Sequence, residues 1–169
     1  MPNVQVVTDS LADIPQDIAE QLEITQVPCI VRFGDHEFRD RVDLYPTEFY
    51  RRLVASPTLP TTSQPVAGEF EAVYRKIGET TDQIISIHVI GNLSGTLNAA
   101  RLGAENVPHL RIEHIDSKQV TMGMGWLVIL AARAAQAGAS LDEIKKMTED
   151  IIPRIHVPVS YTHLTLPTN

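Results

Sequence analysis

Ile84-Ile-Ser-Ile-His-Val-Ile90 is the stretch of this sequence that decides the fold. The run is almost continuously apolar and rich in β-branched residues, which is typical of a strand in the interior of a parallel sheet. A small-residue helical pattern follows over residues 95–104, and residues 110–115 alternate as a second strand. This strand–helix–strand order predicts the α/β class, with a mostly parallel β-sheet flanked by helices.

The same alternation extends toward both ends of the chain. We expect further strands at residues 4–7 and 27–33, a helix at 15–22 capped by Asp13, and a turn at 35–37. Further helices are expected where apolar residues recur at helical spacing, over residues 46–55, 66–77, 119–137 and 140–152. The last of these begins at Ser140, with Glu143 placed three residues later as in a capping box.

The composition describes an ordinary globular chain with an acidic balance. Its 169 residues are 43% hydrophobic and 21% charged, which suits one domain with its own core. A net charge of −7 and the lack of a basic block argue against nucleic acid or an anionic membrane surface as a partner. The start of the chain lacks signal-peptide features and no run reaches membrane-spanning length, so we expect a cytoplasmic protein without membrane insertion.

Cysteine and histidine usage argues against a metal site. The single cysteine, Cys29, excludes an internal disulfide and a cysteine zinc cluster, and its apolar surroundings predict a buried, inert thiol. No two histidines have the i, i+4 spacing of a zinc pair. His88 and His114 fall in or near strands, where packed and hydrogen-bonded roles are expected. The sequence therefore predicts neither a metal nor a cofactor.

Two hydroxyl-rich stretches are the candidate binding motifs. Leu59-Pro-Thr-Thr-Ser-Gln-Pro65 and Leu93-Ser-Gly-Thr96 each place small hydroxyl residues where a loop is expected to run into a helix, the first with Pro65 at the first helical position. Backbone N–H groups at a helix start, together with hydroxyl donors, form a site for an anionic oxygen. Such residues are also common as simple helix caps, so each motif alone has that second interpretation.

Polar residues also follow the expected strands directly, as Thr8-Asp9-Ser10, the 90–94 loop and Asp116-Ser117. The carboxyl ends of parallel strands share one edge of the sheet, and ligands bind outside that edge. The first hydroxyl-rich motif is expected to reach the same edge. The candidate binding residues are therefore Thr61, Thr62, Ser63, Ser94, Gly95, Thr96, Asp9, Ser10, Asp116 and Ser117.

An enzymatic interpretation uses some of the same residues. Ser94 could act as a nucleophile, and Asp9 or Asp116 as a nucleophile or metal carboxylate, in a hydrolase or phosphotransferase. However, Gly91-Asn-Leu-Ser-Gly95 is not the Gly-x-Ser-x-Gly nucleophile elbow, and neither a phosphate-binding loop with its Lys nor a dinucleotide fingerprint is present. An Asp-Ser pair after a strand is also typical of a turn or a helix cap.

The end of the sequence has a different character. Residues 158–169 contain no charged side chain, and residues 159–168 resemble the translation of a sequencing-library adapter. We expect this tail to be foreign, which leaves residues 1–157 as the domain and implies that the natural protein continues beyond residue 158.

Taken together, these motifs resemble the N-terminal domain of the DegV family of bacterial fatty-acid-binding proteins. The resemblance covers residues 3–155. It is carried by Val6-Val-Thr-Asp-Ser10, Pro28, residues 40–43, Pro60-Thr-Thr-Ser-Gln-Pro65, Gly68-Glu-Phe70, Leu93-Ser-Gly-Thr96, Asp116-Ser117 and Gly123-Met-Gly125.

The resemblance implies an α/β lipid-binding domain followed by a second α/β domain that this chain lacks. It implies that one long-chain fatty acid, of the C16–C18 class, lies between the two domains with its carboxylate held by Thr62 and Ser94. The remaining candidate residues would support that site, and no catalytic residue is implied. Some members of the family deliver the bound acid to a separate fatty-acid kinase for phospholipid synthesis.

The sequence departs from the family pattern at two places. Val66 stands where the family often has Ser, and Gly91-Asn92 replaces a Ser-Ser pair. We expect both changes to touch the rim of the pocket and to affect ligand preference, with Thr62 and Ser94 left intact.

Overall fold

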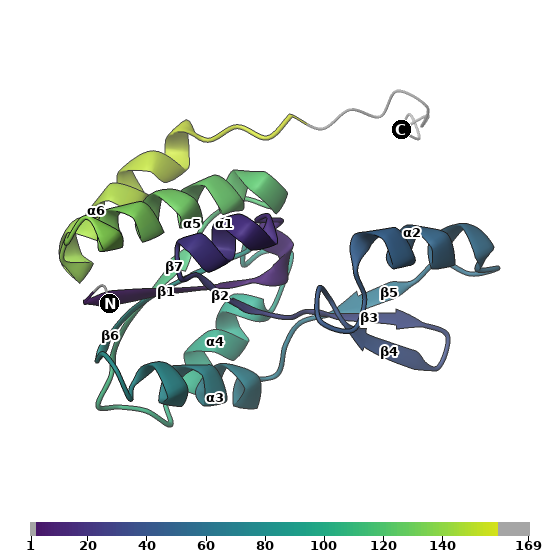
Figure 1. The fold of residues 1–169 in the computed structure, drawn as a ribbon, viewed down its shortest axis with the longest axis horizontal. Coiled ribbons are helices and arrows are strands. Elements are labelled where there is room, and N and C mark those ends of the chain that lie inside the picture. The colour runs from purple at the N-terminus through teal and green to yellow at the C-terminus, as the bar shows by residue number, and fades with distance from the viewer. Residues whose placement is uncertain (1–2, 159–169) are drawn as a thin grey trace.

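The computed structural model describes residues 3–158 and is built around a four-stranded parallel sheet (Figure 1). The strand order is β2-β1-β6-β7, with β1 at Val4–Asp9, β2 at Thr25–Val27, β6 at Gln83–His88 and β7 at Arg111–Asp116. β6 pairs with both β1 and β7 and is almost entirely buried, as its apolar sequence predicts. The predicted α/β class with a mainly parallel sheet is confirmed.

Helices cover both faces of this sheet (Figure 1). α1 (Gln16–Gln21), α5 (Thr121–Gln136) and α6 (Leu141–Ile151) lie on one face, and α3 (Ala67–Ile77) and α4 (Thr96–Ala104) lie on the other. The core is divided into two clusters, one on each face of the sheet, because successive side chains of a strand point to opposite faces. Ile85 packs in the cluster under α5 and α6, whereas Ile84 packs with Phe70 and Tyr74 of α3.

A second, smaller sheet projects from the first. Its antiparallel strands have the order β4-β3-β5, with β3 at Ile30–Phe33, β4 at His36–Arg39 and β5 at Thr61–Ser63. α2 (Pro46–Ala55) packs against it, with the Phe33 and Phe49 rings 5.8 Å apart. We call β3, β4, β5 and α2 the small module.

The small module accounts for three wrong predictions. The expected strand 27–33 is two strands in different sheets, because the chain changes direction at Pro28 and Cys29. The expected turn 35–37 is centred instead on Gly34 and Asp35, and its last two residues already belong to β4. Residues 61–63 form β5 rather than a loop, and α3 begins at Ala67, so Pro65 precedes the helix.

The remaining helices lie within two residues of their predicted positions. The capping box of α6 is confirmed, since Ser140 Oγ accepts from the backbone N–H of Glu143 and the Glu143 carboxylate accepts from the Ser140 N–H. Asp13 does not cap α1. It adopts φ 54°, ends a short 3-10 turn at Ser10–Ala12, and pairs with Arg41 at 2.7 Å.

None of the helices formed by residues 3–158 is both long enough and apolar enough to cross a membrane. The tail expected to be foreign lies outside the described residues from residue 159 onward, so the proposed boundary stays a prediction.

Truncation of β6 tests this arrangement. Ile85 is fully buried, and Ile85→Ala leaves a cavity, so we expect the free energy of unfolding to fall by about 2–5 kcal/mol. Val54 is 88% exposed, and Val54→Ala is the matched control, with an expected change within about 0.5 kcal/mol. Urea unfolding measures both. A loss below 1 kcal/mol for Ile85→Ala would show that β6 is not the centre of the core.

Candidate functional site

The two hydroxyl-rich motifs meet at one small cavity of about 170 Å³. Its walls come from four segments of the chain, and its lining residues are Leu11, Cys29, Thr62, Ser63, Gln64, Leu93, Ser94 and Gly95. The volume corresponds to a few water molecules, so the cavity fits a small polar group better than a whole extended ligand. We call it the hydroxyl pocket.

Residues from the small module and from the edge of the large sheet both line the hydroxyl pocket. Thr62 lies on β5, where its pairing with Val31 of β3 fixes its position in the small module. Ser94 lies in the loop between β6 and α4, at the carboxyl edge of the large sheet. Ser94 therefore lies at the carboxyl edge where ligands of parallel sheets bind, whereas Thr62 belongs to the small module.

The motifs touch each other directly through Gln64 and Gly95. A Cβ atom added at Gly95 would lie 2.5 Å from Gln64 Oε1 and 2.6 Å from Gln64 Nε2. Only a glycine leaves room for the Gln64 amide at this point. The segment that follows β5 and the N-cap of α4 thus come into close contact at the edge of the hydroxyl pocket.

Ser94 is oriented by Thr96. The Ser94 Oγ accepts a hydrogen bond from the Thr96 backbone N–H at 3.3 Å and lies 2.8 Å from the Thr96 hydroxyl. When the Thr96 hydroxyl donates, both lone pairs of Ser94 are used and its own proton is free for an acceptor in the pocket. α4 begins here at Thr96, and its N-cap Gly95 supplies no side-chain cap, so the N-terminal dipole of the helix also favours a negative charge.

The structure divides the predicted site residues into two groups. Thr62, Ser63, Ser94 and Gly95 line the hydroxyl pocket. The others lie outside the lining: Thr61, Thr96, Asp9, Ser10, Asp116 and Ser117.

Asp116 and Ser117 hold the loop that carries Ser94. The Gly91 N–H donates to Asp116 Oδ1 at 3.2 Å, and Lys118 Nζ lies 2.6 Å from Asp116 Oδ2. The Ser117 N–H donates to the His88 carbonyl at 3.0 Å. Within the turn itself, the Lys118 N–H donates to Asp116 Oδ1 at 3.0 Å and the Gln119 N–H donates to Ser117 Oγ at 3.1 Å, which are the turn-forming contacts that an Asp-Ser pair after a strand indicates.

Sequence reasoning did not select Leu11, Cys29, Gln64 or Leu93 as lining residues. Gln64 and Leu93 belong to the two hydroxyl-rich motifs, and this membership could have identified them as lining residues. Leu11 and Cys29 carry no such signal, because they reach the pocket only through the packing of the small module on the large sheet. The predicted burial of Cys29 is confirmed at 3% exposure, and burial, followed by the nearby Asp9 carboxylate, raises the pKa of its thiol to about 12.

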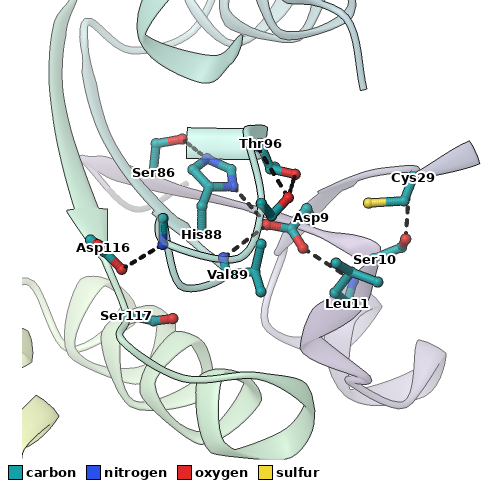
Figure 2. A network of polar contacts seen from close by, with 12 residues as sticks. Asp9, Ser10, Leu11, Cys29, Ser86, His88, Val89, Thr96, Asp116 and Ser117 are labelled. Carbon is teal, nitrogen blue, oxygen red and sulfur yellow. Dashed lines mark hydrogen bonds and ion pairs between the residues drawn. The ribbon is translucent and has the colours of Figure 1, made fainter. Parts of the chain in front are cut away.

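The contacts of Ser94 do not supply a general base. Among the described residues its hydroxyl contacts Thr96, with no imidazole or carboxylate in hydrogen-bond range. The predicted packed role of His88 is confirmed, since it is fully buried and bonded to Asp9 and Ser86 (Figure 2). Within residues 3–158 no group of three His, Cys, Asp or Glu side chains is arranged to hold a metal ion.

The two departures from the family pattern lie away from the lining of the hydroxyl pocket. Val66 is the N-cap of α3, where its backbone N–H donates to Glu69, and its side chain has no acceptor to complete a capping box. Gly91 lies against Asp116, whose Oδ2 would be 3.1 Å from an added Cβ. Val66, Gly91 and Asn92 are absent from the residues that line the hydroxyl pocket, so the lining does not support the expectation that both changes touch its rim.

A larger groove of about 820 Å³ lies elsewhere, between α1, β2, α3 and the segment leading into α2. Its lining is mixed, with Ile14, Val42 and Tyr45 beside charged residues such as Glu20 and Lys76. None of the residues singled out from the sequence as binding residues lies in it.

The raised pKa of Cys29 gives a test of the pocket floor. Because only the thiolate reacts, labelling by a disulfide reagent should accelerate about tenfold per pH unit from pH 7 to 9.5, without a plateau. The urea-unfolded chain is the control, since its thiol has an ordinary pKa near ~8.5 and its rate should level off above that pH. A plateau near pH 8.5 in the folded chain would mean that Cys29 is exposed.

Comparison with known proteins agrees with the geometry. A sequence model of the DegV family, described as a family of uncharacterised proteins, matches residues 3–165. A DegV domain-containing protein of Caldanaerobacter subterraneus is 38% identical over 155 residues, covering 92% of this chain and 55% of the relative. The DegV protein of Bacillus subtilis is 36% identical over 149 residues, covering 87% of this chain and 53% of the relative.

Solved structures give the same result. The crystal structure of DegV, a fatty-acid-binding protein from Bacillus subtilis, superposes with a TM-score of 0.86 at 33% identity, over 90% of this chain and 55% of that one. A fatty-acid-binding DegV protein from Thermus thermophilus has a TM-score of 0.82 at 33% identity. The match covers 90% of this chain and 54% of that protein. The chain spans about half the length of these relatives. With a family match over almost its whole length, this chain belongs to the DegV family.

Proposed function

We propose that the whole protein binds one long-chain fatty acid and that the hydroxyl pocket of this chain holds the carboxylate. The observation that carries the proposal is the convergence of Thr62 and Ser94, from two separate motifs, on one cavity of about 170 Å³. Relatives with the same fold are described as fatty-acid-binding proteins, including a stearic-acid-binding protein of Eubacterium ventriosum with a TM-score of 0.78 at 29% identity.

The chemistry of the pocket suits a carboxylate. Removing a carboxylate from water costs several kcal/mol unless hydrogen bonds replace its hydration. The hydroxyls of Thr62 and Ser94 and the start of α4 can supply such bonds, and none of the described residues that line the pocket is a Lys or Arg. Neutral donors at a helix start bind a negative charge without a formal ion pair.

The acyl chain needs more surface than this pocket offers. Leu11 and Leu93 give the pocket apolar edges where an acyl chain can begin, and Leu93 is 78% exposed in this structure. Each buried CH₂ contributes about 0.8 kcal/mol, so a C16–C18 chain gains most of its affinity from its tail. In the proposal, the half of the protein that lies beyond this chain covers that tail.

We further propose that the bound acid is delivered to a separate fatty-acid kinase. The support is indirect and comes from the resemblance to family members with that role. A carboxylate held by hydroxyls near the edge of two sheets is the end of the ligand that a kinase would have to reach. No residue of this chain is assigned to the kinase contact.

The first test removes the two hydroxyls in the full-length protein, with its natural C-terminal half restored. Thr62→Ala and Ser94→Ala should each cost roughly 1.5–3 kcal/mol of binding, a loss of about 10- to 150-fold in palmitate affinity. Thr62→Ser keeps the hydroxyl and is the matched control, with affinity close to the original. Native mass spectrometry and calorimetry measure occupancy and Kd. Unchanged affinity in both alanine variants would refute the assigned site.

A second test separates binding from stability. In Gly95→Ala the added methyl group displaces the flexible end of Gln64, which is a small cost for folding but changes the contact between the two motifs. We expect a Tm within about 2 °C of the original and at least a fivefold loss of affinity, which is about 1 kcal/mol. Gly68→Ala, whose added Cβ meets nothing within 4 Å, is the control and should change neither quantity. Equal affinity in the two variants would contradict the role of this contact.

A further inference from the structure

A chain of buried polar side chains runs from Tyr74 on α3 to Asp9, and Figure 2 shows its Ser86, His88 and Asp9 part. The Tyr74 hydroxyl lies 2.8 Å from Ser86 Oγ, Ser86 Oγ lies 2.7 Å from His88 Nε2, and His88 Nδ1 lies 2.9 Å from Asp9 Oδ2. All four residues are fully buried. Buried polar groups are costly unless they are bonded, and here each one has a partner.

The donors and acceptors fix the direction of this chain. An ionised Asp9 can only accept, so His88 donates from Nδ1 and its Nε2 becomes the acceptor. Ser86 then donates to His88 and accepts from the Tyr74 hydroxyl. The order resembles a catalytic Asp-His-Ser set, but Ser86 is fully buried beneath Tyr74 and no substrate can reach it.

At its other end, Asp9 binds the backbone that builds the pocket. Asp9 Oδ2 also accepts from the Val89 N–H at 3.2 Å, at the start of the loop that carries Ser94. Asp9 Oδ1 accepts from the N–H of Leu11 at 3.2 Å, and Leu11 lines the pocket. The adjacent Ser10 Oγ accepts from the N–H of Cys29, which forms the pocket floor, at 3.1 Å.

We propose that Asp9, oriented by His88, is a positioning residue that holds the walls of the hydroxyl pocket in place. Asp9 itself does not line the pocket, and it acts through the backbone of the two segments that it bonds. The pocket side of the chain, Asp9 and His88, sets ligand affinity, whereas the far side, Ser86 and Tyr74, contributes only to core stability. The ligand named in the tests rests on the proposed function, but the positioning of the walls does not.

The ligand-independent test uses the reactivity of Cys29, the single cysteine of the chain, at the pocket floor. In Asp9→Asn the side chain keeps its size, but its NH₂ group faces N–H donors, so the pocket walls should loosen. We expect the thiol to be labelled faster, but Asp9→Asn also removes a charge that raises the pKa of this thiol, so the loosening itself is measured by hydrogen exchange of the Leu11 and Cys29 amides. We expect that exchange to be at least about tenfold faster at 25 °C, which corresponds to about 1.4 kcal/mol. Tyr74→Phe is the control, because it weakens the far end of the same chain and should change labelling less than about twofold.

Two His88 variants keep the test decisive if Asp9→Asn does not fold. In His88→Asn the side-chain amide replaces Nδ1 as a donor to Asp9, and the contact with Ser86 is lost. In His88→Leu both contacts are lost. The proposal predicts near-original labelling of Cys29 in His88→Asn and accelerated labelling in His88→Leu, although both variants lower the Tm.

Palmitate binding by the full-length protein completes the test. Asp9→Asn should raise the Kd at least about tenfold at a temperature where it is fully folded, whereas Tyr74→Phe should leave the Kd within about twofold at a comparable loss of Tm. If the labelling rate and the Kd of every variant changed only in proportion to its loss of Tm, the positioning role of Asp9 would be overturned. An original protein that binds no palmitate would refute the proposed function, and the labelling rates would still decide the role of Asp9.

Discussion

Parallel pairing of β1 with β6 is the constraint on which the rest of the structure depends. It brings residues 8–11 and 89–95 to one edge of the sheet, although they are some eighty positions apart in sequence, as the Asp9–Val89 hydrogen bond records. β6 can occupy the centre because helices cover both of its faces: Ile85 and Ile87 pack in one apolar cluster, and Ser86 and His88 on the other face are hydrogen-bonded. The edge of the sheet that carries Ser94 therefore follows from the burial of one strand.

The small module adds what the parallel sheet alone does not provide. It carries Thr62 to the edge where Ser94 lies, and the close approach of Gln64 to Gly95 marks where the two parts meet. A binding site between two rigid elements gains its geometry from their packing, so few of its residues need to belong to either hydrophobic core. This arrangement agrees with the exposure of Thr62 and the burial of Cys29 in the lining of one pocket.

Much of the fold could be predicted from the sequence, because strong apolar periodicity determined the helices and the central strands. β6 and the capping box at Ser140 are examples in which local sequence and final structure agree. The small module could not be predicted, since the pairing of Ile30 with Ser63 joins distant and weakly patterned segments. The hydroxyl motifs identified Thr62, Ser63, Ser94 and Gly95 as candidates, whereas Leu11 and Cys29 depend on tertiary packing and gave no local signal.

The most direct test of the account is a crystal structure of the full-length protein with palmitate. We expect the carboxylate in the hydroxyl pocket, with its oxygens about 2.5–3.0 Å from Thr62 Oγ1 and Ser94 Oγ. A carboxylate bound in the 820 Å³ groove beside α1 and α3, or anywhere away from these two hydroxyls, would contradict it.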